Sequence, residues 1–229
     1  MRWFKCESGE VEECRGCKVG AGWPHLLPLA PQLKALDLGC ATLGELPPQL
    51  ARLTGLTALS LGGSIAAGGW AALAPRLRRL FLCAAGTSDG CSSASSASAS
   101  VSEGDALMAV VSTLTQLTFL HLGGNQMGPG GWGCLRALTR LAHLDASCCG
   151  LSTVPDALST LTGLTMLSLY SNELRWGWEH LNPLTRLQRL DTEDAVLARM
   201  GPWPEGLWVW RTWLSEPIEE VWGSKAWRE

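Results

Sequence analysis

A leucine pattern recurs along most of this chain with a period near 23 residues. Residues 117–127, LTFLHLGGNQM, and residues 164–174, LTMLSLYSNEL, both place leucine at the first, fourth and sixth positions. Seven stretches share the first two of these leucines, with Ala146 and Thr192 in place of the third leucine in two of them, and their starts are separated by 23, 21, 40, 24, 23 and 23 residues. A unit that repeats at a nearly fixed period favours a solenoid of stacked units over a single globular core.

The spacing of the leucines predicts a short strand in each unit. Alternate side chains of a strand point to opposite faces, so Leu120 and Leu122 point inward together. One unit offers roughly five large apolar side chains, each worth about 1.5–3 kcal/mol when buried. Ordering the unit costs on the order of 1.5 kcal/mol per residue, which exceeds that gain. A single unit therefore cannot fold, and several must stack to share one core.

The pattern resembles the leucine-rich repeat, L-x-x-L-x-L-x-x-N/C-x-L, in which Asn125, Cys149 and Asn172 occupy the N/C position. The segments LPPQLARLTGL (46–56) and VPDALSTLTGL (154–164) resemble the second half of intracellular 23-residue repeats such as the plant Ras-group type. This resemblance implies an α/β fold, a leucine-rich-repeat solenoid or horseshoe. A parallel β-sheet would line its concave face, and short helical or irregular segments would line its convex side.

We expect three regions along the chain. Residues 1–25 are an irregular N-terminal segment or cap, and residues 26–200 hold about seven repeats. Residues 201–229 hold half of the 12 tryptophans, as a cap of the open solenoid end or as a docking tail. The long separation of 40 residues coincides with the Ser/Ala-rich stretch 87–105. We expect a disordered loop there, because the stretch has little apolar bulk to offset the entropy of ordering.

Charge and composition narrow the classes of partner and the compartment. A net charge of −3 predicts no nucleic-acid partner, and the absence of an 18-residue apolar stretch predicts no membrane insertion. The N-terminal residues lack the apolar stretch of a signal peptide. Nine cysteines, an odd number, suit a reducing compartment, so we expect a cytoplasmic protein. The resemblance leaves the cytoskeleton or ciliary axoneme as the alternative location.

No enzymatic motif appears in the sequence. There is no G-x-x-x-x-G-K-[ST], no H-E-x-x-H and no G-x-S-x-G. The repeat phase places His121, Asp145 and Ser168 side by side, but catalysis needs the histidine between the serine and the carboxylate. We therefore expect a protein that is not an enzyme, with no cofactor and no small-molecule substrate.

One group of residues near the N-terminus has the composition of a metal site. Cys6, Cys14, Cys17 and His25 follow the spacing C-x7-C-x2-C-x7-H. Four such ligands suit tetrahedral zinc, which would make the chain an adaptor that recruits through a zinc finger. The other interpretation is a set of free thiols, and on it we predict no metal site.

Side chains that flank the inward leucines are predicted to project from the concave sheet. The first two repeats present mostly small residues there, whereas later repeats present aromatic, arginine and charged residues that suit a protein interface. We therefore predict a non-catalytic scaffold or adaptor that binds a protein partner through the concave face and acts in intracellular signalling. The alternative is a structural or regulatory subunit of a cytoskeletal or ciliary assembly. The predicted partner-binding residues are Arg79, Phe81, Phe119, His121, His143, Asp145, Met166, Tyr170, Arg189, Asp191 and Glu193.

Overall fold

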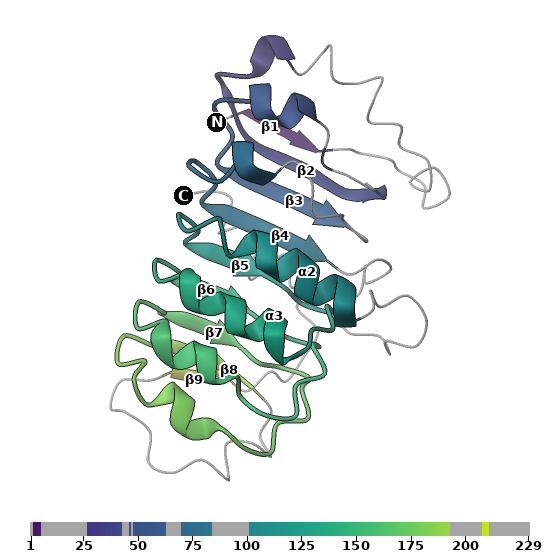
Figure 1. Cartoon of the computed structure of the whole chain (residues 1–229). Coiled ribbons are helices and arrows are strands. Elements are labelled where there is room, and N and C mark those ends of the chain that lie inside the picture. The colour runs from purple at the N-terminus through teal and green to yellow at the C-terminus, as the bar shows by residue number, and fades with distance from the viewer. Residues whose placement is uncertain are drawn as a thin grey trace.

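One parallel sheet organises the computed structural model, which describes residues 2–5, 27–42, 46, 48–62, 70–83, 101–192 and 208–210. The strands in this part of the chain follow one another across the sheet in sequence order, and each pairs in parallel with the next. Figure 1 shows them as successive rungs of one stack. They are β1 (Arg2–Lys5), β2 (Leu33–Thr42), β3 (Ala58–Gly62), β4 (Arg79–Cys83), β5 (Phe119–His121), β6 (His143–Asp145), β7 (Met166–Ser168), β8 (Arg189–Asp191) and β9 (Trp208–Trp210).

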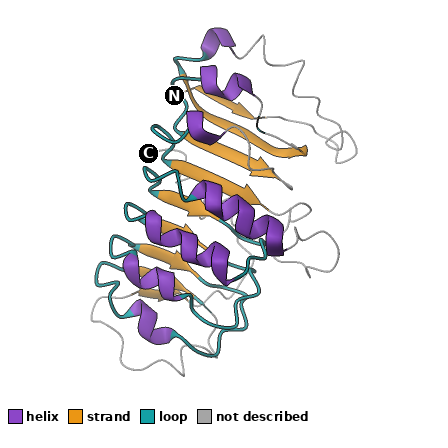
Figure 2. Ribbon diagram, in the orientation of Figure 1, coloured by secondary structure: helices purple, strands orange, loops and turns teal. Residues whose placement is uncertain are grey.

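Short helices return the chain from one strand to the next. Most are single 3-10 turns, and all of the described helices lie along the same side of the sheet (Figure 2). That side is the convex side of the solenoid, so the predicted fold class is confirmed. The segments are η3 (Leu27–Leu29), η4 (Pro48–Arg52), η5 (Trp70–Ala72), α2 (Val101–Val111), α3 (Pro129–Gly133), η6 (Cys134–Ala137), η7 (Asp156–Thr160) and η8 (Trp178–Leu181).

The second leucine of every repeat forms an unbroken column across the sheet. Each of these leucines pairs in register with the equivalent leucine of the next strand, and each is completely buried. The in-register column confirms the alignment that the leucine spacing predicts. Its members are Leu36, Leu59, Leu80, Leu120, Leu144, Leu167 and Leu190.

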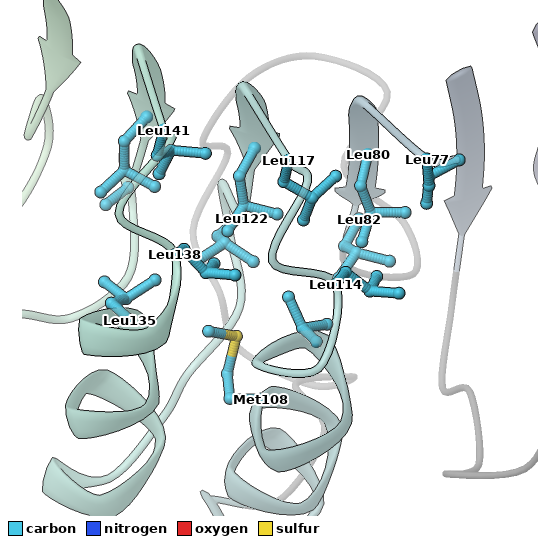
Figure 3. Close-up of a cluster of buried hydrophobic side chains, with 14 of the residues drawn as sticks. Leu77, Leu80, Leu82, Met108, Leu114, Leu117, Leu122, Leu135, Leu138 and Leu141 are labelled. Carbon is cyan, nitrogen blue, oxygen red and sulfur yellow. The ribbon is translucent and has the colours of Figure 1, made fainter. Parts of the chain in front are cut away.

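The strands and the convex helices enclose one shared core. Figure 3 shows leucines of successive repeats packed against one another, with Met108 of α2 inserted among them. Leu158 and Leu161, from the convex half of their repeat, are also fully buried, as the sequence predicts. At about 25 cal/mol per Å² of buried apolar surface, each added repeat stabilises both of its neighbours.

Helix α2 corrects part of the prediction for the Ser/Ala-rich stretch. Residues 101–105 form the first turns of this helix, so the expected disorder over 87–105 is wrong for its last five residues. The Asp105 carboxylate accepts hydrogen bonds from the backbone N–H groups of Gly128 (2.8 Å) and Gly131 (2.9 Å), at the start of α3. Asp105 thus ties α2 to the next convex helix, while Met108 and Val111 anchor α2 in the core. Residues 87–100 lie outside the described residues.

Two strands extend the sheet beyond the leucine pattern. β1 lies within the N-terminal region predicted to be irregular, and β9 lies within the tryptophan-rich region. Phe4 and Val209 continue the register of the leucine column at its two ends. The domain boundaries at residues 25 and 200 stay a prediction.

Asparagine side chains satisfy the backbone of the loops that follow the strands. Asn172 is buried, and its amide nitrogen donates to the carbonyls of Ala146 (2.8 Å) and Leu169 (2.9 Å). Its oxygen accepts from the N–H groups of Cys149 and Leu151, both at 3.0 Å. Each contact to the preceding repeat links two units, which explains the asparagine in the repeat pattern.

Replacing Asn172 by alanine leaves several backbone groups without their partners. At about 1 kcal/mol or more for each unsatisfied buried group, the variant should lose about 2–4 kcal/mol of unfolding free energy, measured by urea denaturation. The matched control is Asn182→Ala at an exposed convex position, which should change stability by less than about 0.5 kcal/mol. Equal stabilities of the two variants would contradict the structural role of Asn172.

Candidate functional site

The concave positions beside the leucine column have the register that the sequence predicts. The first column of the later repeats runs from Arg79 through Phe119 and His143, and the second runs from Phe81 through His121 and Asp145. Both columns continue into β7 and β8 with Met166, Arg189, Ser168 and Asp191. The structure therefore brings these predicted side chains into one continuous band.

Aromatic rings form a connected cluster at the middle of this band. The rings of Phe81 and Phe119 have centroids 4.7 Å apart, and Phe119 meets the edge of His143 at 5.8 Å. The ring of His121 lies 6.1 Å from Phe81. Tilted and edge-to-face arrangements at these distances are favourable for aromatic pairs. We call Phe81, Phe119, His121 and His143 the aromatic cluster.

A histidine–carboxylate pair borders the aromatic cluster. Nδ1 of His121 lies 2.7 Å from the Asp145 carboxylate, and both side chains are largely buried. The other Asp145 oxygen accepts a 2.9 Å hydrogen bond from the N–H of Ser147. Burial by itself raises the pKa of the Asp145 carboxyl, but the positive charge on His121 and the hydrogen bonds from His121 and Ser147 outweigh burial. The net result is a pKa for Asp145 below its ordinary value.

The neighbouring serine belongs to a different contact. The Ser168 hydroxyl lies 3.4 Å from a carboxylate oxygen of Asp191, and Asp145 lies between Ser168 and His121 in the register. His121 is therefore not placed to take a proton from Ser168. The three residues have the order predicted from the repeat phase, and this order does not form a Ser-His-Asp triad.

The predicted binding residues differ in their accessibility. Phe81, Phe119, His121, Asp145 and Asp191 are buried, and Phe119 is only 3% exposed. Half-buried positions are Arg79, His143, Met166 and Arg189, whereas Tyr170 is 36% exposed. Glu193 lies outside the described residues. Buried members of the predicted site thus occur on β6 and β8 as well as on β4 and β5, and its accessible members are Tyr170 and the four half-buried side chains.

Three tryptophans lie outside the set of predicted binding residues. Trp208 and Trp210 of β9 take the register positions next to Arg189 and Asp191. Trp176 is 72% exposed and pairs as an isolated bridge with Thr153 of the preceding repeat. The leucine pattern does not place these tryptophans in the sheet register, because they lie outside the stretches used to align the repeats.

The structure tests the metal and membrane predictions only for the described residues. Cys6, Cys14, Cys17 and His25 lie outside them, so the zinc alternative has no structural test. Within the described ranges, no three His, Cys, Asp or Glu side chains gather as a metal site.

Burial, followed by the nearby Asp145 charge, raises the pKa of the Cys149 thiol well above its ordinary value, so the thiol stays protonated. No described helix combines the length and apolar character needed to cross a bilayer.

The Asp145 pair predicts a specific pH dependence of stability. The unfolded carboxyl has a pKa near ~3.9, and the folded pKa is lower. The contribution is therefore present above about pH 4 and is lost as the pH falls through the folded pKa. Asp145→Asn should lose about 1–3 kcal/mol at neutral pH and show a shallower decline in stability during acid titration, followed by circular dichroism.

The control for this titration is Asp156→Asn. Asp156 is exposed and pairs with the exposed Arg136 at 2.7 Å, and such surface pairs contribute about 0–1 kcal/mol. Its acid titration should follow that of the unaltered protein. The same slope for Asp145→Asn and the unaltered protein would contradict the role given to the His121–Asp145 pair.

Comparison with solved structures identifies the fold. The chain is similar to internalin C2 of Listeria monocytogenes, with a TM-score of 0.52, 17% sequence identity, and coverage of 73% of this chain and 65% of that one. It is also similar to a leucine-rich-repeat protein of Leptospira interrogans, with a TM-score of 0.50, 19% identity, and coverage of 74% and 46%. The chain thus matches less than two thirds of the length of either protein.

Sequence comparison adds no narrower assignment. No family model matches this chain. The search of curated proteins finds no significant match. The plant Ras-group type, a finer subdivision, gains no support and stays a prediction. The register, the shared leucine core and the two structural matches together show that this chain has the leucine-rich-repeat fold.

Proposed function

We propose that this chain is a non-catalytic protein that binds another protein through the concave face of repeats three to seven. Leucine-rich-repeat folds typically present this face to protein partners, although fold alone does not assign a function. The observation that carries the proposal is the in-register band of aromatic, cationic and acidic side chains on β4–β8. A role as scaffold or adaptor in intracellular signalling is part of the same proposal.

The accessible half of this band gives the proposal its contact residues. Tyr170, two residues after β7, is exposed, and Met166 and Arg189 are half-buried on adjacent strands. Tyrosine and arginine are enriched among residues that dominate binding energy at interfaces. Asp145 and Asp191 lie buried beside them and add negative charge to the same face. A protein surface with a central apolar group and basic residues around it would complement this face.

Capture from the native cell followed by calorimetry with the purified partner tests the proposal. Combined Met166→Ala and Tyr170→Ala substitutions should weaken binding at least about tenfold, or about 1.4 kcal/mol, because they truncate two accessible side chains. Both residues are partly solvent-exposed, so their loss should leave the circular dichroism spectrum unchanged.

Arg136→Ala is the matched control, because Arg136 lies on convex segment η6 with its side chain 53% exposed. It should retain the affinity of the unaltered chain. Equal binding by the concave double variant and the unaltered chain would contradict a concave interface on β7. Equal losses in both variants would contradict it as well.

We also propose a cytoplasmic location, which the odd number of nine cysteines supports. In the structure Cys134 and Cys149 are free thiols, whereas Cys148 is disulfide-bonded. A cytoplasmic location requires that this disulfide be reduced in the cell, because disulfides persist in oxidising compartments. Alkylation of the protein in its native cell, followed by mass spectrometry, tests this location. A cytoplasmic protein should have Cys148 alkylated. Protection of Cys148 until a reductant is added would contradict the cytoplasmic proposal.

A further inference from the structure

One edge of the sheet, where the strands begin, carries charge of a single sign. The described segments that lead into β2–β6 are 27–34, 48–57, 70–78, 112–118 and 134–142, and their last residues form the turns along this edge (Figure 2). These segments contain six lysine or arginine residues and no aspartate or glutamate, although the whole chain has a net charge of −3. The cations are Lys34, Arg52, Arg76, Arg78, Arg136 and Arg140.

Five of these cations form no ion pair with a described carboxylate. Arg136 pairs with Asp156 on the convex side at 2.7 Å, and no other ion pair of the described residues involves this edge. Where the other side chains donate hydrogen bonds, the acceptor is an uncharged oxygen, such as the carbonyl of Ala51, 2.9 Å from Nη2 of Arg76. Such bonds leave the positive charge uncompensated. We call Lys34, Arg52, Arg76, Arg78 and Arg140 the basic edge.

A glutamine holds two of the arginines of the basic edge across successive repeats. The backbone carbonyl of Gln116 accepts from Nη1 of Arg78 at 3.4 Å, and its side-chain oxygen accepts from Nη1 of Arg140 at 3.1 Å. The Arg78 backbone is fixed as well, because its carbonyl accepts from the N–H groups of Thr118 (2.8 Å) and Phe119 (3.1 Å). The two guanidinium groups are thus ordered before a ligand arrives, which reduces the entropy lost on binding.

The basic edge is accessible and long enough to hold a short segment of another chain. Arg52 and Arg140 are exposed, and Lys34, Arg76 and Arg78 are half-buried. From β2 to β6 the edge crosses four strand spacings of about 4.8 Å, a length of about 19 Å. About six residues of an extended chain cover this length, at about 3.3 Å per residue.

We propose that the basic edge binds an acidic segment of a protein partner, a run of about six residues rich in aspartate and glutamate. Guanidinium groups match carboxylates with two parallel N–H···O bonds, and charge-assisted bonds are stronger than bonds between neutral groups. This contact goes beyond the proposed function, because it uses the edge of the sheet and does not require the concave interface.

The charge of the whole chain favours a protein segment over a nucleic acid. Nucleic acid carries closely spaced negative charges along its whole length, and a strand that extends past the basic edge meets a chain with a net charge of −3. A short acidic segment confines its charge to the edge. A protein partner can therefore be attracted locally without repulsion from the remaining surface.

Fluorescence anisotropy of a labelled hexaglutamate peptide with the full chain at low ionic strength tests the proposal. The unaltered protein should bind this peptide saturably and should not bind hexaglutamine. Combined Arg78→Gln and Arg140→Gln substitutions should weaken binding at least about fivefold, because they remove two cations of the basic edge. Lys34→Gln with Arg52→Gln should also weaken binding. This second variant leaves both Gln116 contacts in place, so it decides the result if circular dichroism shows that the first variant is misfolded.

Arg136→Gln combined with Arg175→Gln is the charge-matched control. It also removes two cations, but these form ion pairs away from the basic edge, with side chains 53% and 64% exposed. The control should lose less than about twofold in affinity for hexaglutamate, because distant exposed charges are screened. Equal losses from the control and the basic-edge variants would overturn the proposal, because attraction by net charge alone would then explain binding.

Competition and the concave variant separate the remaining explanations. Unlabelled hexaglutamate should displace the labelled peptide more effectively than a thymidine oligonucleotide of six residues. Stronger displacement by the oligonucleotide would overturn the proposal in favour of a nucleic-acid site, and absence of saturable peptide binding would overturn it as well. The Met166→Ala, Tyr170→Ala variant should bind hexaglutamate as the unaltered chain does, whatever its effect on the concave partner. Loss of peptide binding in that variant would place the acidic ligand on the concave face and contradict the basic edge.

Discussion

The in-register stacking of inward leucines is the constraint on which the rest of this structure depends. Each repeat contributes too little apolar surface to fold alone, so its leucines must complete the cores of the repeats on either side. The column from Leu36 to Leu190 meets this requirement strand by strand. Because the leucines fix the register, they also fix which residues lie side by side on the concave face.

Polar contacts then link neighbouring repeats and set the local arrangement of their side chains. Asn172 and the hydroxyls of Thr57, Thr118 and Thr165 each donate to a backbone carbonyl of the preceding repeat. On the concave side, the same register places His121 against Asp145 and Phe81 against Phe119. The band of concave side chains is thus a consequence of the structural repeat, and its chemistry lies in the residues that the repeat leaves free to vary.

The sequence allowed the fold and the neighbours within the site to be predicted, because both depend on a period that can be counted. It did not predict the helix over 101–105, because the support from Asp105 and Met108 comes from contacts distant in sequence. Nor did it predict that Phe119 is buried while Tyr170 is exposed, since repeat phase assigns a face and not what covers that face. The tryptophans of β9 carry no leucine signal at all.

Amide hydrogen exchange of a Leu144→Ala variant tests the central claim most directly. Leu144 is completely buried between Leu120 and Leu167 in the column. If neighbouring repeats share one core, the amides of β5, β6 and β7 should lose protection together, because sub-global opening follows cooperative units. Loss of protection confined to β6, with β5 and β7 as protected as in the unaltered chain, would contradict this account.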